Sequence, residues 1–244
     1  MNRYFKRSNL EFIATLPKIK PISQNNIIGN TFDVRFWYRD QLERISRYPR
    51  SLSELVSHIQ ENRKDWEAKY PRPYWSKIQE IADYWRFDPL IMLSIIRTES
   101  FYNTNAKSPV GARGLMQIMP YTGYSISRDL RDENFSDMDL IDPTINIYYG
   151  GFYIAKLVNY YRGNLPYAIA AYNAGPHKVD EWLKTCEGCP FDEFVDGIPF
   201  RETRQYVKKV LAGYSMYLRI YQDKLYPPLN KKFERSPALL DSLY

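Results

Sequence analysis

The sequence predicts an all-α fold, and three observations carry that prediction. Apolar residues recur at spacings of three and four through most of residues 70–226, which is the period of an amphipathic helix. Asp precedes Pro at 88–89 and at 142–143, a pair typical of helix starts, because Asp accepts backbone N–H groups and Pro fits the first turn. The alternating period of a strand occurs in one short stretch, residues 31–38.

The expected helices follow one another along the chain. The first begins after Ser51, its predicted N-cap, and the stretch YPRPYW at 70–75 then breaks the chain because proline disrupts a helix. Later helices are expected at 75–85, after Asp88-Pro89, from Asp142-Pro143 to Tyr161, from Asn164 to Gly175, after Gly175-Pro176, and at 201–221. We therefore divide the chain into an N-terminal segment with one helix (1–69), a helical domain (70–226) and a C-terminal tail (227–244).

The net charge of +6 belongs wholly to the N-terminal third of the chain. Residues 1–74 hold 14 Lys and Arg against 8 Asp and Glu, whereas residues 75–244 hold 20 of each kind. Such a basic segment suits contact with nucleic acid, anionic lipid or an acidic wall polymer, unless it is simply a solvated surface. The neutral remainder and the lack of a recognised DNA- or RNA-binding motif argue against a nucleic-acid-binding protein.

Neither a membrane helix nor a leader is evident. No apolar run approaches the roughly 18 residues that a transmembrane helix needs. The first 25 residues lack the hydrophobic segment of a secretory signal peptide. Either the protein stays in the cytoplasm, or a leader was removed before this sequence begins.

The two cysteines, Cys186 and Cys189, form a C-x-x-C pair in TCEGCP. Such a pair can be a redox motif, half of a zinc site or a disulfide. Zinc would need two more ligands, and the two histidines, His58 and His177, lack the spacing of a ligand pair. No βαβ pattern surrounds the motif, which argues against thioredoxin-type chemistry. Two local cysteines or a loop disulfide are therefore favoured over a metal site, and we expect neither metal nor organic cofactor.

Glu99 ends an apolar stripe in LIMLSIIRTESFYN, residues 90–103. It falls three residues after Ile96 and four after Ile95, so it continues their helix face. Burial raises the pKa of a carboxyl group, and so does the negative C-terminal end of a helix. A carboxyl that stays protonated near neutral pH can act as a general acid. The alternative is an ion-paired helix end, with Arg97 or Arg113 as the partner.

Three stretches in order carry a family resemblance. ESFYNTNAKSPVGARGLMQIMP (99–120), AIAAYNAGP (168–176) and PFRETRQYVKKVL (199–211) resemble soluble lytic transglycosylases of the bacterial cell wall. The resemblance runs from about Tyr70 to Tyr221. It implies a goose-lysozyme-like helical catalytic domain, cleavage of the MurNAc–GlcNAc β-1,4 bond of peptidoglycan strands, and a place in the cell envelope, periplasmic or associated with the outer membrane.

The resemblance also implies roles for single residues. Glu99 would protonate the leaving oxygen and then accept the proton of the MurNAc 6-hydroxyl, closing a 1,6-anhydro ring without water. Tyr172 would orient Glu99 through its hydroxyl. The expected substrate-binding residues are Ser108 and Gln117, which would bond the N-acetyl group, and Met116, which would shape the cleft wall. Two more are Asn173, with a structural role as the alternative, and Glu202, which either faces the cleft or forms an ion pair.

Two other functions remain open. A hydrolysing muramidase on the same fold would need a second carboxylate to activate water, and the candidates are Asp129, Asp132, Asp137, Asp139 and Asp142. A non-catalytic peptidoglycan-binding module would keep the groove without the acid, and the presence of Glu99 argues against it. Residues 1–69 are expected either to contact the envelope or a membrane surface, or to pack on the catalytic domain as a brace.

Overall fold

The computed structural model describes residues 30–31, 52–186, 189–224 and 228–229. Within them the regular elements are helices, apart from an antiparallel pairing of two two-residue strands, β1 (Asn30–Thr31) and β2 (Pro228–Leu229). This confirms the all-α prediction. Of the extended stretch predicted at 31–38, only Thr31 is described, and it lies in β1; residues 32–38 and the predicted N-cap Ser51 lie outside the described residues.

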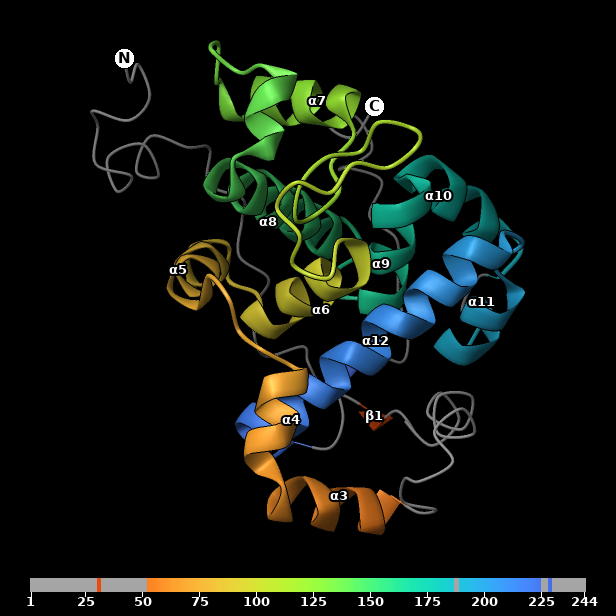
Figure 1. The fold of residues 1–244 in the computed structure, drawn as a ribbon. Coiled ribbons are helices and arrows are strands. Elements are labelled where there is room, and N and C mark those ends of the chain that lie inside the picture. Colours follow the sequence, from red (N-terminus) through yellow and green to blue (C-terminus); the bar gives the residue numbers. More distant parts are fainter. Residues whose placement is uncertain (1–29, 32–51, 187–188, 225–227, 230–244) are drawn as a thin grey trace.

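The helices follow the predicted order (Figure 1). They are α3 (Leu52–Glu61), α4 (Arg63–Lys69), α5 (Trp75–Trp85), α6 (Pro89–Glu99), α7 (Pro120–Leu130), the 3₁₀ helix η2 (Asp137–Ile141), α8 (Pro143–Tyr160), α9 (Leu165–Ala174), α10 (Pro176–Lys184), α11 (Phe191–Gly197) and α12 (Arg201–Gln222). Three elements beyond residue 69, α7, η2 and α11, were not predicted. Both η2 and α11 are too short for a periodic pattern to be recognised, and Gly123 interrupts the pattern of α7.

The two Asp-Pro pairs begin helices as predicted. Asp88 accepts a hydrogen bond from the backbone N–H of Leu90 at 2.9 Å, and Asp142 accepts one from Thr144 at 2.8 Å. These side chains satisfy N–H groups that have no partner inside the helix. The start of α6 is thereby fixed, and with it the direction in which Glu99 projects eleven residues later.

Helix α6 lies at the centre of the fold, with α12 across it and α5 beside it (Figure 1). Every residue from 90 to 96 is at most 1% exposed. Ser94 donates a 2.6 Å hydrogen bond to the carbonyl of Val210 on α12. A Cβ at Gly213 would lie 2.4 Å from the Ser94 hydroxyl, so this glycine permits the close approach of the two helices. The helix that carries Glu99 is therefore held in place by close packing against its neighbours.

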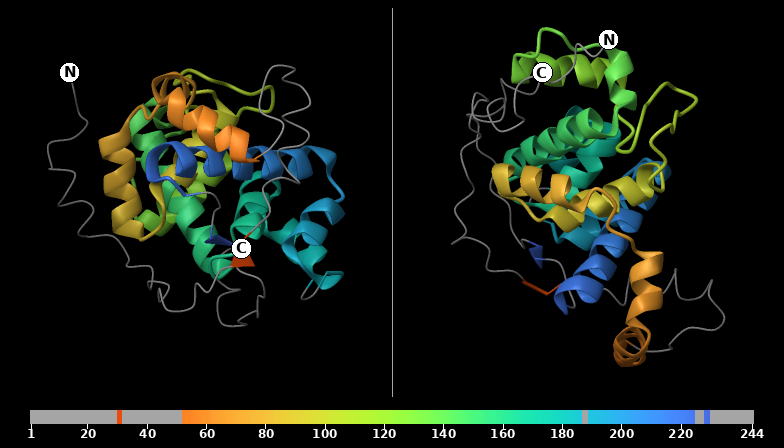
Figure 2. Two further views of the ribbon diagram at one scale, coloured as in Figure 1. Left: turned by 90° about the horizontal axis from the view of Figure 1, so that it is seen from below. Right: turned by 60° about the vertical axis from the view of Figure 1, so that its left-hand side comes forward.

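Helices α3 and α4 pack against the C-terminal part of α12, at the end of the molecule away from α7 (Figure 2). Ile59 and Trp66 form a small apolar cluster there with Met216 and Ile220. The segment 1–69 thus contains two described helices and not the single one predicted, because Asn62 leaves the helical conformation between them. The domain boundary at residue 69 stays a prediction. A membrane-spanning helix is not found in the part of the chain that the structure describes.

Candidate active site

Glu99 is the last residue of α6, as predicted, and it receives a hydrogen bond from a tyrosine. The hydroxyl of Tyr206, on α12, donates to Glu99 Oε1 at 2.7 Å. Burial raises the pKa of Glu99 from 4.5 to about 7; the Tyr206 hydrogen bond acts in the opposite direction, and the negative charge of Glu202 adds to the rise. A large fraction of Glu99 is therefore protonated at neutral pH, which a general acid requires.

The cations proposed as ion-pair partners of Glu99 are occupied elsewhere. Arg113 forms a 2.8 Å ion pair with Asp137, and Arg97 donates to the carbonyl of Lys69 at 2.8 Å. Among the described residues, no ion pair includes Glu99. A salt bridge would hold the carboxyl ionised, so its absence here and the burial favour the protonated form.

Tyr172 makes a different contact from the one expected. Its hydroxyl donates to the carbonyl oxygen of Met116 at 2.9 Å, and its ring centroid lies 5.5 Å from that of Tyr153. The negative charge of Glu99 adds to the effect of burial in raising the pKa of Tyr172, so the two groups interact without a direct hydrogen bond between them. The hydrogen bond that we expected from Tyr172 comes from Tyr206.

Tyr206 is not among the site residues predicted from the sequence. It lies four residues after Glu202 in RETRQYV, and this spacing places both side chains on one face of α12. That face includes the two groups of α12 that act on the pKa of Glu99. The spacing of four residues between Glu202, a predicted site residue, and Tyr206 was the sequence feature that could have identified Tyr206.

Ser108 and Gln117 shape the loop between α6 and α7. The amide nitrogen of Gln117 donates to the carbonyls of Ala106 and Gly114 at 3.1 and 2.9 Å. The hydroxyl of Ser108 accepts from the N–H of Ala112 at 2.9 Å. Gly114 has φ +75°, and a Cβ there would lie 2.3 Å from a carbonyl oxygen of η2. These contacts give both side chains a structural role, while binding of an N-acetyl group by them remains a proposal.

Asn146, on α8, holds the same loop from the core and was missed in the sequence. Its Oδ1 accepts from the N–H of Met116 at 2.7 Å, and its Nδ2 donates to the carbonyls of Arg113 and Leu140 at 2.9 and 2.8 Å. The side chain is 0% exposed, and every partner is a backbone group. The sequence feature that could have identified Asn146 is its position as a polar residue inside the apolar run of α8, because a buried amide needs hydrogen-bond partners.

Met116 is a core residue, which corrects the prediction that its side chain shapes a cleft wall. The side chain is 0% exposed. A Cβ at Gly150 would lie 2.3 Å from its sulfur atom, so α8 leaves room for it by lacking a side chain there. Met116 supports the site through its backbone, which bonds Tyr172 and Asn146.

Asn173 and Glu202 lie near the start of α12. Asn173 is exposed at the end of α9, and its Oδ1 accepts a 2.7 Å hydrogen bond from the hydroxyl of Thr203. Glu202 is exposed on the first turn of α12. It takes part in no ion pair among the described residues, and its charge acts on Glu99. The ion-pair alternative for Glu202 is therefore not supported.

The five aspartates considered as a second carboxylate all have structural partners. Asp129 pairs with Lys156, Asp132 accepts from Tyr149, Asp137 pairs with Arg113, Asp139 joins Ser136 in a capping box, and Asp142 caps α8. Among the described residues, the carboxylate whose charge acts on the pKa of Glu99 is that of Glu202. The described residues contain no group of three or more His, Cys, Asp or Glu arranged to hold a metal ion.

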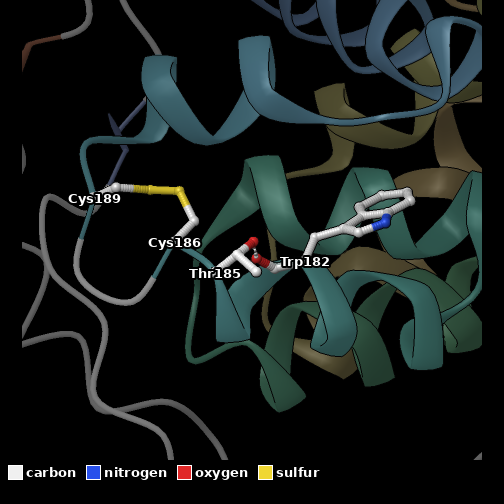
Figure 3. The surroundings of a disulfide bond; sticks show 4 residues. All are labelled: Trp182, Thr185, Cys186 and Cys189. Carbon is white, nitrogen blue, oxygen red and sulfur yellow. Dashed lines mark hydrogen bonds between the residues drawn. A yellow bond between two sulfur atoms is a disulfide. The ribbon is translucent and has the colours of Figure 1, made fainter.

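Cys186 and Cys189 form a disulfide between α10 and α11 (Figure 3). Their Cα atoms are 5.3 Å apart, and the indole of Trp182 points away from the bond. The hydroxyl of Thr185 donates to the carbonyl of Trp182 at 2.8 Å, which ends α10 just before the disulfide. Of the alternatives for the C-x-x-C pair, the loop disulfide is the one that the structure contains.

Residues 76–194 match the family model described as "Transglycosylase SLT domain", and residues 197–226 match "Soluble lytic transglycosylase helical domain". Residues 76–194 form a transglycosylase SLT domain. The resemblance inferred from the three sequence stretches is thereby confirmed. Glu99, Tyr172 and the loop held by Asn146 all lie in the SLT domain, and Tyr206 and Glu202 lie in the helical segment that follows it.

Curated relatives and solved structures carry the same family name. The chain is 34% identical over 189 residues to soluble lytic murein transglycosylase of Escherichia coli (strain K12), covering 77% of this chain and 28% of the relative. Identity to the Salmonella typhimurium protein of that name is 43% over 129 residues, which is 52% of this chain and 20% of the relative. The structure of an inactive glutamate-to-glutamine mutant of lytic transglycosylase Slt from Pseudomonas aeruginosa is similar, with a TM-score of 0.64, 29% identity, and coverage of 83% of this chain and 32% of that one. The chain thus spans less than a third of the length of the Escherichia coli relative. Its fold is that of the SLT lytic transglycosylases, which confirms the predicted lysozyme-like fold.

Proposed function

We propose that the chain is a peptidoglycan lytic transglycosylase, which cleaves the MurNAc–GlcNAc β-1,4 bond and leaves a 1,6-anhydro-MurNAc end. The setting of Glu99 carries the proposal: a largely buried carboxyl with a pKa of about 7, a tyrosine hydroxyl on one oxygen, and no ion pair among the described residues. The SLT domain and the names of its relatives support the same reaction.

In the first step Glu99 acts as an acid. Tyr206 bonds Oε1, which leaves Oε2 to hold the proton and deliver it to the glycosidic oxygen. The bond from C1 of MurNAc to that oxygen breaks, and the GlcNAc side leaves as an alcohol. The carbonyl of the MurNAc N-acetyl group stabilises the positive charge at C1. General acid catalysis of this kind contributes about 10²–10⁴-fold to the rate.

In the second step the ionised Glu99 acts as a base. It accepts the proton of the MurNAc 6-hydroxyl while that oxygen attacks C1, so the ring closes and Glu99 returns to its protonated form. One carboxylate is enough for this cycle, and the structural engagement of the five aspartates supports it. A hydrolysing muramidase would instead use a second carboxylate to position water, and Glu202 is the residue that such a mechanism would require.

Sugar binding is proposed for four residues: Ser108 and Gln117 from the loop after α6, Asn173 from the end of α9, and Glu202 from the start of α12. Tyr172 would act indirectly, because its hydroxyl holds the Met116 carbonyl of that loop. A non-catalytic wall-binding module would need these groups and would have no use for a carboxyl group with a raised pKa.

A location in the bacterial cell envelope follows from the substrate. The Cys186–Cys189 disulfide supports it, because disulfides persist in oxidising compartments such as the periplasm. The basic charge of the first 74 residues would favour an anionic partner there, either a wall polymer or a membrane surface. The packing of α3 and α4 on α12 supports the brace as a further role of segment 1–69.

The proposal is tested by incubating purified peptidoglycan with the wild-type protein and with Glu99→Gln, and analysing the fragments by mass spectrometry. Wild type should release anhydro-muropeptides, and the mutant should release none. Glu193→Gln, an exposed glutamate on α11, is the matched control and should keep full activity. Anhydro products from a folded Glu99→Gln protein would overturn the assignment of the acid.

A further inference from the structure

Arg97, two residues before Glu99 on α6, joins two segments that are far apart in sequence. Its guanidinium lies 4.3 Å from the ring centroid of Tyr70, at the end of α4, and 4.8 Å from that of Phe101, in the turn after Glu99. One of its N–H groups donates to the carbonyl of Lys69 at 2.8 Å. A planar guanidinium can stack on two rings and still donate in its plane, which the ammonium of lysine cannot do.

A second connection holds the same turn. Tyr102, the residue after Phe101, is hydrogen-bonded through its hydroxyl to the hydroxyl of Tyr217 on α12. The Tyr217 hydroxyl donates in turn to the carbonyl of Pro71 at 3.0 Å. Both connections therefore run from the turn that follows Glu99 to the segment 69–71, which leads out of α4.

The turn itself has a backbone conformation that needs external support. Phe101 and Tyr102 have φ values of +48° and +67°, in the left-handed region that side chains other than glycine disfavour. Two consecutive residues of this kind cost free energy that the contacts of their side chains must offset. Without those contacts the end of α6 would be freer to move relative to α12, where Tyr206 and Glu202 lie.

We propose that Arg97 is a positioning residue for the reaction: by clamping the turn Phe101–Tyr102 to the segment 69–71, it keeps Glu99 seated against Tyr206 and shielded from water. The inference rests on the proposed function for its catalytic meaning, but the position of Glu99 can be measured without turnover. It also gives helix α4 a part in the site, because Lys69 is the last residue of α4 and Tyr70 is its C-cap.

Loss of the clamp has a defined consequence for Glu99. The groups that face it from packed elements are Tyr206 and Glu202 on α12 and Tyr172 on α9. Losing the Tyr206 hydrogen bond would raise the pKa of Glu99, but burial has the larger effect, so a carboxyl that moves toward water should titrate closer to 4.5. A purely electrostatic role for Arg97 predicts the opposite sign, because removing a nearby positive charge raises the pKa of a carboxyl group.

The test is a carbon NMR titration of protein labelled at its glutamate carboxyl groups, with the Glu99 signal identified by its loss in Glu99→Gln. The variants are Arg97→Lys, which keeps the charge, Arg97→Met, which removes it, and Tyr102→Phe, which removes only the hydroxyl. The matched control is Arg72→Met, because Arg72 also lies near two rings, 4.7 Å from that of Trp75 and 4.0 Å from that of Tyr221, and these are not the rings of the turn.

The clamp predicts that both Arg97 variants and Tyr102→Phe lower the Glu99 pKa, by about one unit or more for Arg97→Lys, while Arg72→Met leaves it unchanged. The alkaline limb of kcat should move to lower pH by the same amount, with KM little changed.

An unchanged pKa in Arg97→Lys, or a raised one in Arg97→Met, would overturn the inference. If Arg97→Met fails to fold, the other two variants decide. If wild type releases no anhydro products, the proposed function fails while the titration still answers the question about Arg97.

Discussion

The hydroxyl of Tyr206 lies 2.7 Å from Oε1 of Glu99, and this contact joins the end of α6 to α12 across 107 positions of sequence. It fixes one oxygen of the carboxyl and, in the proposed reaction, leaves the other for the substrate. It also opposes the effect of burial on the pKa of Glu99. In the proposed reaction this single hydroxyl would influence both the direction of proton transfer and the pH range in which it occurs.

Tyr206→Phe should move the alkaline limb of the activity profile to higher pH. The hydrogen bond lowers the pKa of Glu99, so its loss lets that pKa rise above about 7. Activity at pH 6 should still fall, by about tenfold for the loss of roughly 1.4 kcal/mol of orientation. The control is Tyr214→Phe, because Tyr214 on the same helix bonds the carboxylate of Asp88 at 2.9 Å, and this variant should leave the limb in place. An unshifted limb in Tyr206→Phe would contradict the role given to this bond.

Glu202→Gln should move the same limb to lower pH. The negative charge of Glu202 raises the pKa of Glu99, so its removal lowers that pKa and narrows the range in which the acid is protonated. The products should remain anhydro-muropeptides, because Glu202 activates no water in the single-carboxylate reaction. The pH profile and the fragment masses are measured together, with Glu193→Gln as the control. Complete loss of activity at every pH would point to a second catalytic carboxylate.

Glu99→Gln should stabilise the folded protein at pH 8. The unfolded chain releases the Glu99 proton near pH 4.5, and the folded protein releases it near 7. Between these values the folded state binds more protons, so its stability falls as the pH rises through this window. Above it the ionised, buried carboxyl costs roughly 1–3 kcal/mol. Urea unfolding at pH 8 and pH 4.5 measures this, and an equal difference between mutant and wild type at both pH values would refute it.

Asn146→Ala should destabilise the protein by about 2–4 kcal/mol, because three buried backbone groups lose their partner. Those groups belong to Met116, Arg113 and Leu140, and they hold the loop after α6. Urea unfolding of Asn146→Ala is compared with that of Asn159→Ala, a half-buried position on the same helix. A loss no larger than that of the control would show that the loop is held by other contacts.

Neutralising the N-terminal segment should weaken wall binding in a salt-dependent manner. Arg3, Lys6, Arg7 and Lys18 are replaced together by Gln, which removes four of the 14 cations of residues 1–74. Sedimentation with purified peptidoglycan should fall at low salt, and the difference should vanish at about 1 M salt, where the Debye length is near 3 Å. Replacing the exposed Lys107, Lys184, Lys209 and Lys224 is the control. Equal losses in both variants would mean that total charge matters and its placement does not.

The features that the sequence predicted correctly depend on local chemistry. Asp88 and Asp142 begin their helices because an Asp-Pro pair needs only its own first turn to act as a cap. Glu99 could be placed at a helix end because it shares the period of the apolar residues before it. Helix order and the position of the acid follow from such signals.

The features that were missed depend on how distant helices pack. Which tyrosine reaches Glu99 is decided by the crossing of α12 over α6, and no local pattern contains that information. The same limit explains Met116, whose side chain fills the space left by Gly150 on another helix. Periodicity identifies which residues share a face, but the partner of that face is set by tertiary packing.

In the proposed reaction one carboxylate, Glu99, acts as acid and base and no water is consumed. The most direct measurement is digestion of purified peptidoglycan in water enriched in heavy oxygen, followed by mass spectrometry of the newly formed MurNAc ends. Intramolecular ring closure predicts anhydro ends that contain no heavy oxygen and are absent with Glu99→Gln. Heavy oxygen in each new end would contradict the claim and would identify the protein as a hydrolysing muramidase.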